Sequence, residues 1–257
     1  MSAASWFLGL LFPGVDLAVA LAVVAVYVLG VRLIEKRPLT EFCRHHAAAD
    51  FRNGSLWALL FLAALLVPLI LQGNLVIGGI NDWGLQVPSL IAAAAMAAVC
   101  EEILFRGLLF RLTESSLGSL IAVLLSSLLF GAAHFLNPHA TLTRAIGVGL
   151  EAGLGISALY MLTRTLWICI AIHFTWNLVT GLLGLPDSGG TSAGLFRSTL
   201  RGNELLTGGD FGVEASALVI IPGIVIGVGL LIVAYKRHCV IPPFWERQPP
   251  RPAWEHE

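Results

Sequence analysis

Residues 88–110 read PSLIAAAAMAAVCEEILFRGLLF, an apolar run that carries Glu101, Glu102 and Arg106 in its second half. A hydrocarbon core about 30 Å thick needs roughly 20 apolar residues in a helix. Because backbone groups in lipid must bond within the segment, this run predicts a transmembrane helix. Ionisable side chains at membrane depth cost free energy unless they are paired or face a cavity, so the three charges mark a candidate functional site.

The whole chain has the composition of a membrane protein. It is 57% hydrophobic and 12% charged, with a mean hydropathy of +0.84, whereas soluble domains carry about 25% charged residues. A net charge of -1 gives no field that would attract nucleic acid, so we expect no nucleic-acid partner. The four cysteines show neither a CxxC pair nor metal-binding spacing, and no disulfide framework is expected.

Apolar runs are spread along the chain and predict about seven spans. They lie near residues 15–34, 55–72, 88–110, 118–136, 144–162, 166–184 and 214–235. This pattern is typical of an all-α, polytopic transmembrane bundle. We expect one helical membrane domain over residues 1–240, with the motif-bearing core in 88–184, followed by a Pro-rich cytoplasmic tail over 241–257.

Basic residues predict the orientation in the membrane. They gather after the first run, as Arg32, Lys36, Arg37, Arg44 and Arg52, and after the last, as Lys236, Arg237, Arg247 and Arg251. Cytoplasmic loops carry such an excess, so both segments are predicted to be cytoplasmic and the N-terminus to lie outside. The Gly-rich segment 186–212 is predicted to be an external loop and a candidate lid. We expect a multi-pass protein of a cell membrane, such as a bacterial inner membrane.

The polar side chains inside the apolar runs fall into three groups. In chain order these are Glu101, Glu102 and Arg106; Phe130 and His134; and His173 and Asn177. Helical residues four apart share a face, so Arg106 can neutralise Glu102. Glu101 points about 100° away from Glu102 and is left unpaired, as a general base requires.

The same spacing places Phe130 beside His134 and His173 beside Asn177. We therefore expect both histidines and the Asn177 amide to converge with Glu101 on one cavity between helices. Counting about 1.5 Å per residue along straight helices spreads these groups over roughly 13 Å of depth. Convergence therefore requires tilted or broken helices, or span ends that differ from the predicted ones.

Together, the motifs EExxxR, FxxxH and HxxxN on separate apolar runs resemble the CPBP family of intramembrane proteases. This family includes the CAAX prenyl endopeptidases of the Rce1 type and the bacterial Abi proteins. The resemblance covers roughly residues 88–184 and includes all seven residues of the three groups. It implies an endopeptidase that acts on a membrane-embedded or lipidated protein or peptide, for example a prenylated, CAAX-like one. Such a substrate would reach the site from the cytoplasm and from the lipid bilayer.

The resemblance also implies a role for each residue. Glu101 would activate a water for attack on a peptide carbonyl, helped by His134. His173 and Asn177 would stabilise the oxyanion, and Glu102 with Arg106 would orient the site.

The sequence leaves open whether the site uses a metal. Glu101, His134 and His173 could hold a divalent ion such as zinc with an open position for water. However, Asn is a poor zinc ligand, and no HExxH helix is present. We therefore favour a site with no metal and no other cofactor.

Several of these residues also have structural interpretations. The pair Glu102–Arg106 can hold a helix in place without taking part in chemistry. Glu151, inside GVGLEAGLG, can line the cavity, tune Glu101, or pack against Arg144 or a turn. The glycines of the same run predict close helix packing: Gly147, Gly149, Gly153 and Gly155.

Two non-proteolytic functions are alternatives. A membrane scaffold or immunity-type protein could retain the motif as a polar core without catalysis. A proton-coupled transporter could use intramembrane Glu and His as a relay. The chain lacks the repeat symmetry that transporters show, so this function ranks last.

Overall fold

The computed structural model describes residues 3–81, 86–190 and 194–247. It confirms a polytopic helical membrane protein, with six described segments long and apolar enough to cross a bilayer. These spans are Pro13–Glu35, Ala47–Leu71, Val87–Leu117, Leu142–Thr163, Leu166–Leu183 and Ala217–Lys236. The predicted run 118–136 forms a shorter apolar helix, Ser119–His134.

Several spans combine more than one helical element. The α-helices are α1 (Ala3–Leu29), α2 (Ala47–Leu71), α3 (Gln86–Glu102), α4 (Arg111–Leu117), α5 (Ser119–His134), α6 (Leu142–Val148), α7 (Leu154–Thr163), α8 (Leu166–Leu183), α9 (Glu204–Thr207) and α10 (Ala217–Lys236). The π-helical segments are η1 (Gly30–Glu35), η3 (Ile103–Phe110) and η4 (Gly149–Gly153). Short 3-10 turns are η2 (Thr40–Phe42), η5 (Val213–Ala215) and η6 (Phe244–Glu246).

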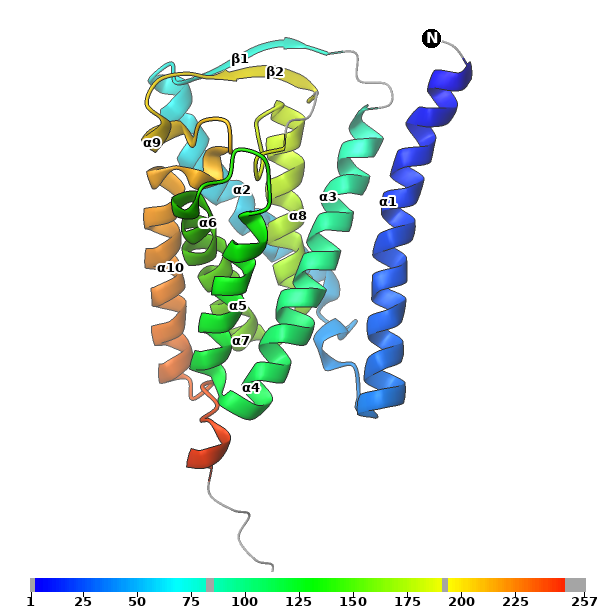
Figure 1. The fold of residues 1–257 in the computed structure, drawn as a ribbon, viewed down its shortest axis with the longest axis vertical. Coiled ribbons are helices and arrows are strands. Elements are labelled where there is room, and N and C mark those ends of the chain that lie inside the picture. The colour runs from blue at the N-terminus through cyan, green and yellow to red at the C-terminus, as the bar shows by residue number, and fades with distance from the viewer. Residues whose placement is uncertain (1–2, 82–85, 191–193, 248–257) are drawn as a thin grey trace, which may run out of the picture.

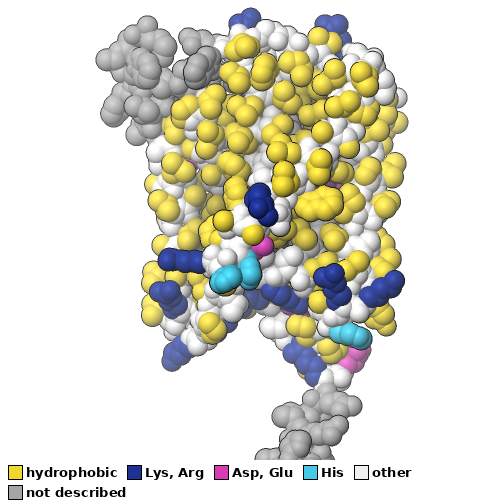
Figure 2. Space-filling view, turned by 180° about the vertical axis from the view of Figure 1, so that it is seen from behind, with side chains coloured by type: hydrophobic (Ala, Val, Ile, Leu, Met, Phe, Trp, Pro, Cys, Tyr) yellow, Lys and Arg dark blue, Asp and Glu magenta, His cyan; other side chains and the backbone are white. Residues whose placement is uncertain are grey.

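The two ends of the bundle differ in character. Strands β1 (Leu75–Ile80) and β2 (Phe196–Leu200) pair antiparallel across one end, here called the sheet end (Figure 1). The opposite end carries α4 and the C-terminal end of α10, and we call it the basic end. The basic segments after α1 and after α10 both lie there, as their predicted common side requires. Figure 2 shows one face covered largely by hydrophobic side chains, with most of its Lys and Arg side chains in the lower part.

Two regions differ from the predicted elements. Helix α2 begins at Ala47, well before the predicted residue 55, and its first turns contain the polar residues Asp50, Arg52 and Asn53. The predicted external loop 186–212 is folded in large part, since it contains β2 and α9. Strand β2 was not predicted because its partner is distant in the sequence. That partner, β1, is the short run LVIGGI, and the helices from α3 to α8 lie between the two strands in the chain.

The first residues of the predicted tail pack against the basic end. The Ile241 N–H donates to Ser119 Oγ at 2.8 Å, and the Ser119 N–H donates to the Ile241 carbonyl at 2.9 Å. Arg247 donates to the Ser115 carbonyl at 2.9 Å. Residues 241–247 therefore continue the membrane domain, and the remainder of the predicted tail lies outside the described residues.

Small residues bring the helices close together, as three of the four predicted glycines show. A Cβ at Gly147 would lie 2.6 Å from Ile220 Cδ1, one at Gly149 would lie 2.8 Å from the Ser127 carbonyl oxygen, and one at Gly153 would lie 2.9 Å from Ser127 Cα. These glycines therefore permit contact with α5 and α10. Gly155 is different, because nothing lies within 4 Å of its Cβ position.

The crossing of α2 and α8 depends on Gly54, which the sequence analysis did not single out. A Cβ there would lie 2.6 Å from the Ile168 carbonyl oxygen and 2.9 Å from Ala171 Cβ. One turn away, Thr175 donates to Ser55 Oγ at 3.0 Å across the same interface. This crossing places α8, which carries His173, against α2.

We expect Gly54→Ala to destabilise the protein by about 1–3 kcal/mol, because the added methyl group overpacks the α2–α8 contact. The measurement is the thermal unfolding midpoint of the purified protein in detergent. Gly14→Ala is the matched control, since nothing lies within 4 Å of a Cβ at that α1 position. Equal midpoints for the two variants would contradict the close approach.

Candidate active site

A buried ion pair stands at the centre of the polar residues. Arg106 Nη1 lies 3.0 Å from Glu102 Oε1, and both side chains are 0% exposed. Arg106 Nη2 donates to the carbonyl oxygens of Ala152 and Gly153, each at 3.2 Å. The guanidinium carbon also lies 4.8 Å from the centre of the Phe130 ring, at cation–π distance. Arg106 therefore joins the α3–η3 span to η4 and α5.

The two adjacent glutamates have different environments, as the helical spacing predicts. Glu102 accepts a second hydrogen bond from His173 Nδ1 at 2.9 Å. His173 Nε2 lies 3.9 Å from Glu101 Oε2. That oxygen has no hydrogen-bond partner, and the Glu101 side chain is 34% exposed. Glu102 is thus held by two partners, while Glu101 is free beside His173.

His134 is the last residue of α5 and lies beside the same site. The helix has 16 residues, ends at His134 and stops well short of the sheet end (Figure 1). The ring of Phe130 lies 4.6 Å from that of His134 and 6.3 Å from that of His173, so it stands between the two histidines. The predicted offset in depth assumed that the span carrying Glu101 ends near residue 110, whereas that span continues to Leu117.

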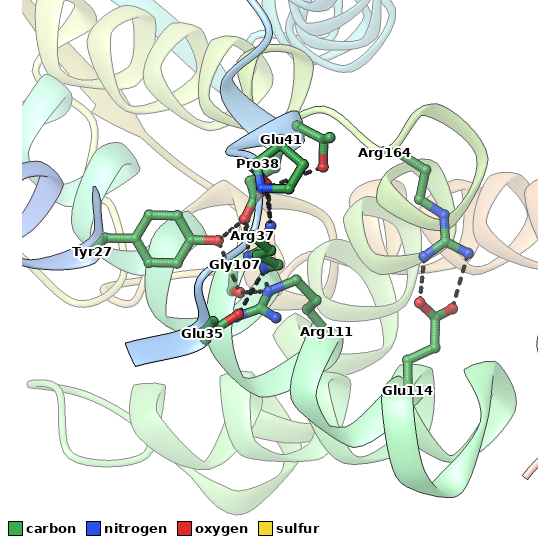
Figure 3. Close-up of polar contacts among 10 residues, drawn as sticks. Tyr27, Glu35, Arg37, Pro38, Glu41, Gly107, Arg111, Glu114 and Arg164 are labelled. Carbon is green, nitrogen blue, oxygen red and sulfur yellow. Dashed lines mark hydrogen bonds and ion pairs between the residues drawn. The ribbon is translucent and has the colours of Figure 1, made fainter. Parts of the chain in front are cut away.

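The π-helical segment η3, which includes Arg106, is fastened at the basic end. π-Helical turns leave a backbone carbonyl without its usual partner, and they are frequent at functional sites. Here the Gly107 carbonyl accepts from Arg111 Nε at 2.8 Å and from the Tyr27 hydroxyl at 3.2 Å (Figure 3). Tyr27 comes from α1, so this contact also attaches α1 to the motif-bearing span.

Glu41 organises the polar cluster around this contact. Its carboxylate is 1% exposed and accepts from Tyr27 and from Arg37, whose Nη2 lies 2.6 Å from Oε1. Burial alone would raise the pKa of Glu41, but the hydrogen bonds from Arg37 and Tyr27 lower it to about 2. Arg111 extends the cluster through an ion pair with Glu35 at 2.6 Å (Figure 3).

A cavity of about 520 Å³ lies between α2, α5, α8, α10 and the η4–α7 segment. Its polar wall contains His134, Glu151, His173, Asn177, Ser188 and Glu214. The predicted convergence of both histidines and the Asn177 amide is therefore present. Glu101 Oε2 lies 3.9 Å from Nε2 of His173, which lines the cavity, but Glu101 is not itself among the lining residues.

The cavity opens toward lipid between α2 and α10. Three residues that line it, Trp57 and Leu60 on α2 and Ile226 on α10, are 67%, 64% and 49% exposed. The wall of the remainder is mainly apolar, with Leu159, Ile168 and Leu230 in it. An amphiphile can therefore enter from the bilayer with its apolar part in this section.

The connection after α8 closes the cavity on the side of the sheet end, and sequence reasoning missed it. Helix α8 ends where Gly184 takes a φ of 68°. Asp187 Oδ2 then accepts from Thr180 Oγ1 at 3.2 Å, the Gly189 N–H donates to the Phe211 carbonyl at 2.6 Å, and the Ser188 N–H donates to Glu214. In the sequence, the one indication of this connection's role was Glu214, an acid at the start of the last apolar run.

Two carboxyl groups of this connection are electrostatically unfavourable. Burial raises the pKa of Asp187, although the nearby charge of His173 and the Thr180 hydrogen bond act in the opposite direction. Burial raises the pKa of Glu214 well above its usual range, and the charge of Asp187 adds to that effect. Burial therefore disfavours the charged form of both acids, and a nearby cation would counter this effect.

Glu151 takes one of its three predicted positions. Glu151 lines the cavity and packs closely against α10, where a Cβ at Gly223 would lie 2.6 Å from the Glu151 Cβ. Packing against Arg144 is wrong, because Arg144 pairs with Glu204 at 3.0 Å.

In the part of the chain that the structure describes, no three His, Cys, Asp or Glu side chains are placed to hold one metal ion. The alternative ligand set Glu101, His134 and His173 is therefore not assembled in this geometry.

Residues 83–179 match a family model described as Type II CAAX prenyl endopeptidase Rce1-like. We call residues 83–179 the Rce1-like core. The Rce1-like core contains all seven motif residues, and Asp187, Ser188 and Glu214 lie beyond it. No curated protein and no solved structure gives a significant match to the chain.

We expect Arg106→Gln to destabilise the Rce1-like core by about 3–5 kcal/mol, because it leaves the buried Glu102 without its cation. Glu101→Gln is the matched control, since Glu101 Oε2 has no hydrogen-bond partner to lose and only a 3.9 Å contact with His173. Thermal unfolding midpoints in one detergent compare them. If Glu101→Gln lowered the unfolding midpoint as much as Arg106→Gln does, the two glutamates would not differ in their contribution to stability, and the prediction would fail.

Glu41 makes stability depend on pH at the basic end. Because its folded-state pKa is lowered to about 2, its contribution is full above the ordinary Glu pKa and is lost as pH falls toward 2. Glu41→Gln should therefore lower the unfolding midpoint most at pH 6–7, and the difference from wild type should shrink at about pH 3. A difference that stays constant with pH would exclude this role.

Proposed function

We propose that the Rce1-like core is an intramembrane endopeptidase in which Glu101 activates the attacking water. The observation that carries this proposal is the difference in hydrogen-bond partners between the two glutamates. Glu102 is held by Arg106 at 3.0 Å and by His173 at 2.9 Å. Glu101 presents an unpartnered oxygen 3.9 Å from His173 Nε2, so it is the carboxylate free to accept a proton.

In the proposed reaction, a water gives a proton to Glu101 and its oxygen attacks the peptide carbonyl carbon. The tetrahedral oxyanion is stabilised by the Asn177 amide and by Nε2–H of a protonated His173, whose Nδ1–H is held by Glu102. Glu101 then passes its proton to the leaving nitrogen as the C–N bond breaks. His134 assists through Nε2, since its Nδ1 is engaged with the Phe130 carbonyl at 2.8 Å.

The cavity supports a membrane-associated substrate. Its mouth lies between α2 and α10, where exposed apolar side chains contact lipid, and its deeper wall is mainly apolar. A protein or peptide with a lipidated or membrane-embedded segment can place that segment there. A prenylated, CAAX-like protein is the specific substrate that we propose on the family match.

The test uses quenched fluorescent peptides, one prenylated and one not, with the purified protein in lipid nanodiscs. We expect Glu101→Gln to lower kcat/KM by about 10²–10⁴-fold, the usual effect of losing a general base. His173→Ala should abolish cleavage as well, and Cys100→Ala should cleave like wild type. Wild-type cleavage by Glu101→Gln would contradict the proposal, and cleavage that a chelator stops would require a metal.

A further inference from the structure

Glu214 is a buried carboxylate that the proposed reaction does not use. It is 3% exposed and lines the cavity on the side of the sheet end. One of its oxygens accepts the Ser188 N–H, but Oε2 has no hydrogen-bond partner. A buried carboxylate oxygen without a donor costs several kcal/mol at ordinary estimates, so this position calls for a donor from outside the chain.

Two further acids act on Glu214 through their charges. Both Asp187 and Glu151 raise the pKa of Glu214 through their charges. Glu151 lines the same cavity, and Asp187, which accepts a hydrogen bond from Thr180, directly precedes Ser188 of the cavity wall. We call Glu151, Asp187 and Glu214 the acidic pocket.

Among the described residues, no Lys or Arg neutralises the acidic pocket, and the charges of His173 and His134 act on Asp187. No Lys or Arg lines the cavity. Arg106 attracts Glu151, but its Nη1 and Nη2 donate to Glu102 and to the carbonyls of η4. Arg144, on the neighbouring α6, donates to Glu204 and to the His139 carbonyl instead.

We propose that the acidic pocket binds an ammonium or guanidinium group of the molecule that occupies the cavity. Such a group supplies several donors at once, and its hydrogen bonds to carboxylates are strong. The apolar part of the same molecule lies along Leu159, Ile168 and Leu230 toward the lipid-facing mouth. A free carboxylate at this end would be repelled by the three acids.

This inference rests on the proposed function for its substrate. In that frame, the cation is a Lys or Arg side chain or a free amine of the substrate, on the sheet-end side of the cleaved bond. The acidic pocket would then select among membrane segments by their charge, while Glu101 and His173 perform the hydrolysis.

The experiment measures binding and not cleavage, so that it stands apart from the protease test. The protein carries Glu101→Gln, is held in lipid nanodiscs, and is heated with n-octylammonium or with n-octanol. We expect octylammonium to raise the unfolding midpoint more than octanol. Adding Glu214→Gln should weaken the octylammonium affinity about tenfold or more, as loss of a hydrogen bond to a charged group does.

Two further variants complete the test. Glu151→Gln should weaken octylammonium binding too, and it serves if Glu214→Gln does not fold. Asp210→Asn removes an exposed acid of the same connection and should bind like the parent. Equal shifts with octylammonium and octanol, shifts that persist in both glutamine variants, or an equal shift with Na⁺ or Ca²⁺ would overturn the proposal. A protein without protease activity would still show the expected difference.

Discussion

The fold of the core depends on a cation placed where no water can reach it. Arg106 is fully buried at membrane depth, and an uncompensated charge there would prevent folding. The chain compensates it with a carboxylate from the preceding turn, with two backbone carbonyls and with an aromatic face. These partners come from three separate segments, so they must assemble together. The arrangement of the site follows from this requirement.

The same requirement accounts for the two π-helical segments near the site. Segment η3 contains Arg106, and η4 contains Ala152 and Gly153, whose carbonyl oxygens accept from it. In a regular α-helix these carbonyls would have intrahelical partners only, whereas π-helical turns change which carbonyls are free. The π-helical backbone therefore lies where its carbonyl oxygens can accept hydrogen bonds from the Arg106 guanidinium. This agrees with the rule that polar backbone groups in a membrane must be hydrogen-bonded.

Local patterns were sufficient to predict the membrane bundle and the pairing of Glu102 with Arg106. Run length fixes the class of helix, and a spacing of four fixes which charge meets which. The end of α5 could not be predicted, because Phe135 and Leu136 continue the apolar run after His134. Asp187 and Glu214 were hidden for another reason. They lie in the connection between α8 and α10, which is rich in glycine. Only tertiary contacts, such as that of Gly189 with Phe211, fold this connection against the bundle.

The strand pair at the sheet end has a consequence for biosynthesis. Leu75 pairs with Leu200, and the whole Rce1-like core lies between them in the sequence. Such non-local pairing is slow, because the entropy of closing a long loop is lost before the contact forms. During translation β1 cannot pair until β2 has been synthesised, which happens after α8. The sheet therefore forms late, on a chain that already contains every motif-bearing segment.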